Sequence, residues 1–191
     1  MSWKSYIKTI GLVATVVGVV GCAQPKEDEV IYSNVIYSPD TRIDGYFDDQ
    51  YTIFKSIYSD FIVERVSDRE IKIVIPSQYG YAVDKSTLNR NMRNHLAAMS
   101  KTLRDYRDTA IVIHGHTDHD GNMRHNLKLA QARADSVKVE LLKNHIDSNR
   151  IKTVAESFEM PRCPNTTAVG KECNRRVEII VKAQPFNMRN M

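Results

Sequence analysis

The sequence predicts an α/β (α+β) sandwich, in which helices pack on a mixed β-sheet. From residue 61 onward, segments with strand composition alternate with segments whose apolar residues repeat at helical spacing. The run 110–113 is short and wholly apolar, which is typical of a strand covered by helices. Hydrophobic residues make up 42% of the chain and charged residues 26%, a composition typical of a folded domain. One globular domain is therefore expected at residues 61–191.

The first elements of this domain are two strands and a helix. Strands are expected at residues 61–66 and 71–75, separated by a tight turn and ended by Pro76. The hydroxyls of Ser86 and Thr87 are expected to cap the helix that follows. Its apolar residues are spaced three and four apart, which predicts one buried face: Leu88, Met92, Leu96, Met99, Leu103 and Tyr106.

The second half of the domain repeats this alternation. A second helix is expected over about residues 123–145, after the apolar strand. Strands at residues 151–155 and 177–181 would complete the sheet. The inward face of the second helix is expected to contain five apolar residues: Leu127, Ala130, Ala134, Val137 and Leu141.

The N-terminus predicts export. Lys4 and Lys8 precede a small and apolar run at residues 10–20, which is too short to span a bilayer comfortably. Residues 19–22 read V-V-G-C, which resembles a bacterial lipobox, so residues 1–21 are expected to be a signal peptide. Cys22 would then carry acyl chains such as palmitate, and the absence of Asp after it favours the periplasmic face of the outer membrane. The alternative is an ordinary cleavage site beside a stray cysteine.

Residues 22–60 are expected to be the lipidated N-terminus and an acidic linker. Residues 23–60 contain three basic and eight acidic side chains, whereas residues 61–191 contain 22 basic and 15 acidic ones. Fully extended, the linker would reach about 120 Å at ~3.3 Å per residue. Its repeat of V-I-Y-S at residues 30–33 and 35–38 has strand composition, so a segment that docks on a partner is the alternative to a plain tether. Export excludes a nucleic-acid partner.

The two remaining cysteines predict a disulfide. Cys163 and Cys173 form an even pair once Cys22 is acylated, and an exported protein lies in an oxidising compartment. Such a bridge would close a loop of about ten residues, worth roughly 2–3 kcal/mol if unstrained.

Three segments together have the sequence features of a known family. Residues 111–118 read I-V-I-H-G-H-T-D, residues 126–134 read N-L-K-L-A-Q-A-R-A, and residues 174–179 read N-R-R-V-E-I. In this order they resemble the signature of OmpA-like peptidoglycan-binding domains, over about residues 70–183. The resemblance implies the same mixed sheet with helices packed on it, in a module that is not an enzyme and needs no cofactor.

Asp118 and Arg133 are the candidate binding residues. Asp118 follows the buried strand, and Arg133 lies seven residues after Asn126 on the same side of a helix. On spacing alone an ordinary salt bridge is favoured over a pair that binds a zwitterion, ammonium on the acid and carboxylate on the base. The resemblance favours the zwitterion, because the family's Asp and Arg bind the free amino-acid end of meso-diaminopimelate in peptidoglycan stem peptides. Thr117 would add polar contacts, and Asn126 would brace the loop.

The same segment also spells a metal-site pattern. His114, His116, Asp118 and His119 fit the H-x-H-x-D-H pattern of metallo-β-lactamase-like hydrolases, and alternate strand residues share a face. A dinuclear site needs further well-separated downstream ligands, which this chain lacks. The sequence therefore predicts no bound metal, and a metal-dependent hydrolase is the alternative function.

The protein is predicted to be a lipoprotein that binds peptidoglycan and tethers the outer membrane to the cell wall. Residues 30–60 could instead contact other envelope proteins, for example those of a secretion system. Between general tethering and service in such a machine, the tyrosine-rich N-terminal segment mildly favours the machine.

Overall fold

The computed structural model describes residues 31–32, 35–36 and 39–184. The chain divides into two units, residues 1–36 and 37–191. In the first unit, β1 (Ile31–Tyr32) pairs with β2 (Val35–Ile36) in an antiparallel arrangement. The predicted signal peptide and Cys22 lie outside the described residues. No helix in the described ranges is long and apolar enough to cross a membrane.

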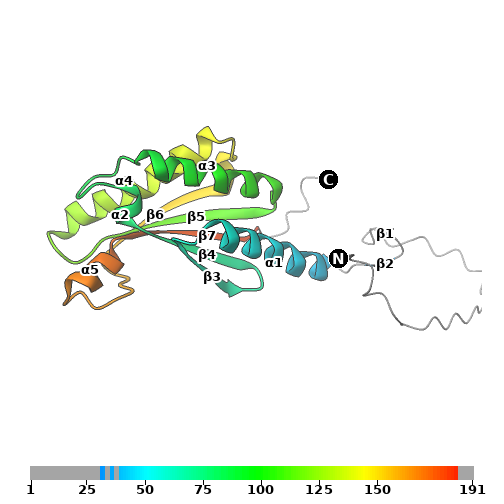
Figure 1. Cartoon of the computed structure of the whole chain (residues 1–191), viewed down its shortest axis with the longest axis horizontal. Helices are drawn as coiled ribbons and strands as arrows, with labels where there is room; N and C mark the ends of the chain where they lie inside the picture. Colours follow the sequence, from blue (N-terminus) through cyan, green and yellow to red (C-terminus); the bar gives the residue numbers. More distant parts are fainter. Residues whose placement is uncertain (1–30, 33–34, 37–38, 185–191) are drawn as a thin grey trace, which may run out of the picture. The chain divides into compact units, whose positions relative to one another are not determined.

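The second unit is built on a five-stranded mixed sheet with the order β3-β4-β7-β5-β6 (Figure 1). The neighbours β3, β4, β7 and β5 pair antiparallel, and β5 pairs with β6 in parallel. The predicted fold class is confirmed, and the apolar run 110–113 lies in a strand flanked on both sides. The strands are β3 (Ile62–Ser67), β4 (Glu70–Pro76), β5 (Thr109–His116), β6 (Ile151–Ser157) and β7 (Arg176–Ala183).

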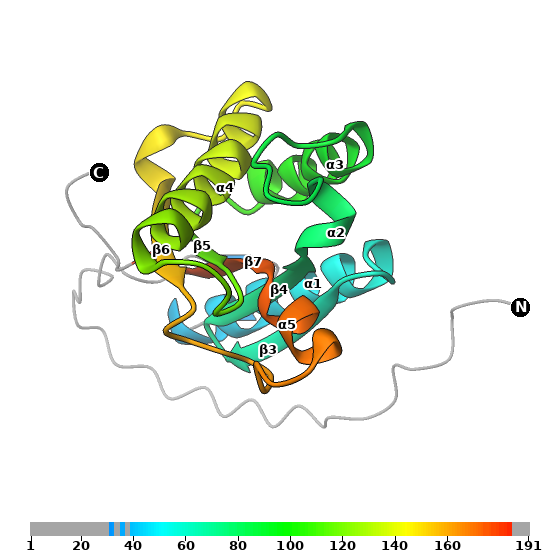
Figure 2. The ribbon, with the colours of Figure 1, turned by 90° about the vertical axis from the view of Figure 1, so that its left-hand side faces the viewer.

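The helices α3 (Arg90–Asp105) and α4 (Met123–Lys143) lie on the same side of this sheet (Figure 2). Ile73, Ile179 and Ile113 are register partners on neighbouring strands, and all three are fully buried. They form the core with most residues of the two predicted helix stripes, but Tyr106 and Leu127 are not among the buried core residues. Burying this apolar surface contributes about 25 cal/mol per Å². The shorter helices are α2 (Ser77–Gly80), the 3-10 turn η1 (Ser148–Arg150) and α5 (Ala168–Asn174).

The prediction that residues 22–60 form a linker is wrong for the second half of this range. Residues 39–57 form α1 (Pro39–Ile57), and its side chains Phe47, Phe54 and Tyr58, the last just beyond its end, are almost fully buried in the core. These residues and Tyr51 are spaced four, three and four apart, a helical period that the turn-like residues around Gly45 obscured. A proline at the first helical position is favourable, and one glycine within a helix costs only about 1 kcal/mol.

Two further details differ from the sequence prediction. Asn89, and not Ser86 or Thr87, caps α3: its side-chain oxygen accepts a hydrogen bond from the Met92 amide at 2.8 Å. Leu127 is 37% exposed, so the inward face of α4 is narrower than expected. That face uses alanines because α4 lies directly on β5, where a Cβ built on Gly115 would be 2.1 Å from the Ala130 carbonyl oxygen.

Candidate functional site

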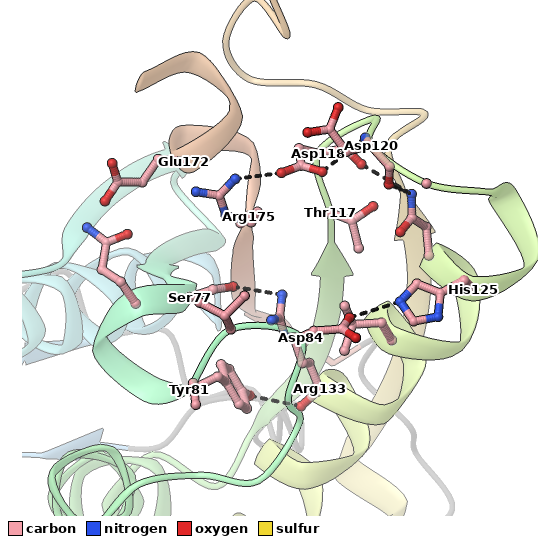
Figure 3. A pocket seen from close by; sticks show the side chains of 16 residues that line it. Ser77, Tyr81, Asp84, Thr117, Asp118, Asp120, His125, Arg133, Glu172 and Arg175 are labelled. Carbon is pink, nitrogen blue, oxygen red and sulfur yellow. Dashed lines mark hydrogen bonds and ion pairs between the residues drawn. The ribbon is translucent and has the colours of Figure 1, made fainter. Parts of the chain in front are cut away.

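A pocket of about 850 Å³ opens at the end of β5, beside the first turn of α4 (Figure 3). The loop after α2 forms a second wall, and the end of α5 forms a third. All four binding residues proposed from the sequence line this pocket: Thr117, Asp118, Asn126 and Arg133. The charged and polar lining residues include Ser77, Asp84, Thr117, Asp118, Asp120, His125, Asn126, Arg133, Glu172 and Arg175.

Asp118 presents an oriented carboxylate. Its Oδ1 accepts a hydrogen bond from the Asp120 amide at 3.1 Å, and its Oδ2 lies 2.5 Å from the Arg175 Nη1. The side chain of Asp118 is 12% exposed and that of Arg175 is 41% exposed. A carboxylate has about four lone-pair sites, so acceptor capacity remains for a ligand cation.

The salt bridge between Asp118 and Arg133 that spacing alone favoured is not formed. Figure 3 shows the two side chains on opposite sides of the pocket, with Asp118 turned to Arg175. Arg175 immediately precedes β7, which pairs antiparallel with β5, so the sheet brings it beside Asp118. Residue 175 is the main functional residue that sequence reasoning missed, although its motif at residues 174–179 had been noticed.

Arg133 is a buried guanidinium, only 2% exposed, on α4. Its Nε donates to the Lys85 carbonyl oxygen at 3.0 Å, its Nη1 donates to the Ser77 hydroxyl at 3.3 Å, and its charge lies 5.1 Å from the centre of the Tyr81 ring. No described residue forms an ion pair with it, and burial lowers its pKa. A guanidinium has five N–H donors, so Arg133 keeps donors for an anion in the pocket.

Tyr81 fixes the far wall of the site. Its hydroxyl lies 3.1 Å from the Arg133 carbonyl oxygen, to which it donates, and 3.1 Å from the Ser136 hydroxyl. Burial raises the pKa of Tyr81 to about 12, so the hydroxyl remains protonated near neutral pH. At the mouth, the His125 Nε2 lies 2.9 Å from the Asp84 Oδ1. These contacts join the loop after α2 to α4.

Thr117 and Asn126 have different roles in the loop. The Thr117 amide donates to the Ser157 carbonyl oxygen at 2.8 Å, and its buried hydroxyl has no hydrogen-bond partner among the described residues. The Asn126 side-chain amide donates to the carbonyl oxygens of Asp120 at 2.8 Å and Asp118 at 3.4 Å. Asn126 therefore braces the loop, and Thr117 offers a free polar group.

The histidines of the metal-site pattern do not converge with Asp118. The His114 Nδ1 lies 2.7 Å from the Glu156 Oε1, and the exposed His119 lies beside Asp120. Across the described ranges, no group of three or more His, Cys, Asp or Glu side chains is placed to hold a metal ion. Asp118 is directed at Arg175, so the spelling of the motif does not correspond to a shared site.

Burial of His116 is expected to cause a specific loss of folding stability in acid. It is 3% exposed, and burial, with Arg176 next, lowers its pKa to about 4 against the opposing effect of Glu178. The unfolded chain, with a pKa of about 6.5, then binds the proton first, so stability is complete above pH ~6.5 and falls as the pH drops toward 4. Urea denaturation should show a loss of up to about 3 kcal/mol over this interval.

The matched comparison is His116→Gln against His119→Gln. The first variant should have a flatter dependence of unfolding free energy on pH between 6.5 and 4.5, and the second should follow the wild type. Below pH 4.5 the lowered pKa of Glu178 adds its own loss, so the upper interval isolates the histidine. Equal slopes for the wild type and His116→Gln would contradict the prediction.

The pocket lies mostly in a segment with known relatives. Residues 81–175 match the model of the OmpA family. The probable lipoprotein YiaD of Escherichia coli is 35% identical over 113 residues, covering 59% of this chain and 52% of that protein. The peptidoglycan-associated lipoprotein of Mesorhizobium japonicum is 28% identical over 95 residues, covering 50% of this chain and 56% of that protein. The chain thus spans about half the length of these relatives.

A solved structure has a similar fold. The structure of the cell wall anchor of the T6SS from Pseudomonas aeruginosa superposes with a TM-score of 0.59 at 25% identity. The superposition covers 75% of this chain and 98% of that chain. The matched family segment includes Asp118, Arg133 and Arg175.

Proposed function

Because this chain contains a domain of the OmpA family, matched over residues 81–175, we propose that the protein binds peptidoglycan non-covalently and tethers the outer membrane, or an envelope machine, to the cell wall. Relatives named as a peptidoglycan-associated lipoprotein and a cell wall anchor support this function. The pocket at the end of β5 is the proposed binding site.

The observation that carries the proposal is the charge arrangement of the pocket. Arg133 is a buried cation without a described carboxylate partner, and Asp118 is an oriented carboxylate on the opposite side. A ligand that bears an ammonium and a carboxylate on one carbon complements both groups, and a guanidinium can bind its carboxylate through two parallel hydrogen bonds. The free amino-acid end of meso-diaminopimelate in an uncrosslinked stem peptide is such a ligand.

Arg175 supports this arrangement from the third wall. It pairs with Asp118 but remains partly exposed, so it orients the acid and keeps donors directed to solvent. Thr117, whose hydroxyl has no hydrogen-bond partner among the described residues, also lines the pocket. The pocket is thereby suited to a small, doubly charged group.

The proposed anchor is Cys22, with the acyl chains in the outer membrane. Because α1 belongs to the second unit, the proposed tether is shortened to residues 23–38. Fully extended at ~3.4 Å per residue, it would reach about 55 Å, less than the reach expected for residues 23–60. As a flexible coil it would span only about 20–24 Å. The domain would therefore bind the wall closer to the membrane than a linker of residues 22–60 allowed.

A sedimentation assay tests the function. The full chain should pellet with purified sacculi that contain meso-diaminopimelate, and muramidase digestion should release it. Lysine-type sacculi are the matched control, because lysine offers the ammonium without the adjacent carboxylate. No pelleting with either wall would refute the function, and equal pelleting with both would refute the proposed ligand. In fractionated cells, the Cys22→Ser variant should be absent from the membrane fraction, and it should still bind sacculi.

We further propose that the protein is a component of an envelope machine. It is supported by the similarity to the T6SS anchor along nearly all of that chain. Deleting residues 30–38 should leave sacculus binding intact, since the pocket residues remain. Loss of co-purifying envelope proteins on this deletion would support a docking segment, and an unchanged set would support a plain spacer.

A further inference from the structure

The segment between β6 and β7, residues 158–175, forms one wall of the pocket and contacts both aspartates of the β5–α4 loop. The Arg175 Nη1 lies 2.5 Å from the Asp118 Oδ2. The Lys171 Nζ lies 2.9 Å from each carboxylate oxygen of Asp120. Two cations of this segment, which we call the α5 segment, therefore contact the acidic side of the pocket, and Figure 3 shows the contact of Arg175 with Asp118.

Apolar burial does little to fix the α5 segment. The buried hydrophobic core contains no residue between Ile151 and Val177. Met160 is 61% exposed and Val169 is 77% exposed. Packing of the kind that fixes the rest of the domain is therefore largely absent here, and the segment depends on other interactions.

A disulfide and one asparagine provide several of those interactions, beside the Arg162–Glu64 ion pair at 2.6 Å and the hydrogen bond from the Arg176 Nη2 to the Met160 carbonyl oxygen at 3.0 Å. Cys163 and Cys173 are bonded, with their Cα atoms 6.1 Å apart. Asn174 is fully buried, and its Oδ1 accepts hydrogen bonds from the amides of Arg162 at 2.8 Å and Cys163 at 2.9 Å. Its Nδ2 donates to the Cys163 carbonyl oxygen and to the Asn165 side chain, both at 2.8 Å. The disulfide and Asn174 thus join the same two stretches of backbone.

The position of this junction links it to the pocket. Cys173 lies two residues after Lys171 and two residues before Arg175, so the bridge stands between the two cations that contact the loop. Opening the bridge would restore conformational freedom to a loop of about ten residues. Arg175 is 41% exposed on its side chain and would then be free to leave Asp118.

We propose that the Cys163–Cys173 disulfide is a positioning group for the pocket, and that reducing the bridge weakens ligand binding while the core stays folded. The ligand part of this proposal rests on the proposed function. The reductant is a dithiol: its thiolate attacks one sulfur, the S–S bond breaks, and its second thiol closes a ring. The products are two protein thiols and one cyclic disulfide.

The test compares oxidised protein, dithiothreitol-treated protein and the double variant Cys163→Ser/Cys173→Ser. The probe is the soluble tripeptide L-Ala-γ-D-Glu-meso-diaminopimelate, measured by calorimetry. Reduction and the double substitution should each raise the Kd about tenfold, with unchanged far-ultraviolet circular dichroism and a cooperative melt. Dithiothreitol should not change the Kd of the double variant, which controls for the reagent.

A second readout separates positioning from general stability. The Asp120 amide, which donates to Asp118, should exchange its hydrogen faster once the bridge is open, while amides of β4 and β7 remain protected. In a Lys171→Gln/Arg175→Gln background, opening the bridge should change the Kd much less, because the groups through which it acts are gone. Equal losses in both backgrounds would overturn the proposal.

The outcomes distinguish the two proposals. If oxidised wild-type protein does not bind the tripeptide or diaminopimelate-type sacculi, the proposed function fails, and exchange at Asp120 still decides whether the bridge positions the loop. If the wild type binds and reduction changes neither the Kd nor this exchange, the positioning role is refuted and the function stands.

Discussion

Replacing Arg133 with alanine is expected to raise the Kd for the stem tripeptide by roughly 30- to 5,000-fold. Removing one member of a buried charge pair costs about 2–5 kcal/mol, since the partner charge stays desolvated and unpaired, and each ~1.4 kcal/mol is tenfold. Here the stranded partner is the ligand carboxylate, in a site where Arg133 itself is 2% exposed. Asp118→Ala should have a loss of the same order, through the ligand ammonium. Calorimetry with the tripeptide measures both.

Matched variants show which property of Arg133 matters. Arg133→Lys keeps a charge but loses the planar pair of donors, so intermediate affinity is expected. Lys128→Ala removes an exposed positive charge from the same helix and should leave the Kd unchanged. Because Arg133 also contacts Lys85 and Ser77, each variant needs a matched melt and circular dichroism spectrum. Wild-type affinity in a folded Arg133→Ala protein would refute the site.

Gly115→Ala is expected to have the largest effect on folding. A Cβ at this position would lie 2.1 Å from the Ala130 carbonyl oxygen and 2.7 Å from its carbon, which are backbone atoms that cannot rotate away. The helix α4 would have to move off β5, and a loss of about 3 kcal/mol or more in unfolding free energy follows, at the upper end of overpacking costs. Urea denaturation of the purified variant measures it. A displaced α4 would also carry Arg133 out of position.

Gly45→Ala is the matched control for this substitution. Nothing lies within 4 Å of a Cβ built on Gly45, which is exposed within α1. Replacing a helical glycine with alanine should stabilise the protein by up to about 1 kcal/mol. A neutral Gly115→Ala would mean that α4 does not lie against β5 as described, and a strongly destabilising Gly45→Ala would contradict the placement of α1.

The elements that the sequence predicted well have local signals. Strand composition and helical spacing located the five-stranded sheet, α3 and α4, because the side-chain period along a segment reports which face is buried. The three motifs around residues 111–118, 126–134 and 174–179 led to the correct family, as the match over residues 81–175 confirms. The helix α1 was missed, since its aromatic period is interrupted by residues with turn propensity.

The sequence by itself determined the fold class and the family, and it predicted two charged residues of the pocket, Asp118 and Arg133, but not Arg175. It could not determine their partners. Arg175 is 57 positions from Asp118, and only the insertion of β7 between β4 and β5 brings the two together. The same limit applies to Tyr81 under Arg133 and to Lys171 on Asp120. Hydrophobic periodicity acts over a few residues, whereas an ion pair depends on the distance between segments that only the packed sheet and helices establish.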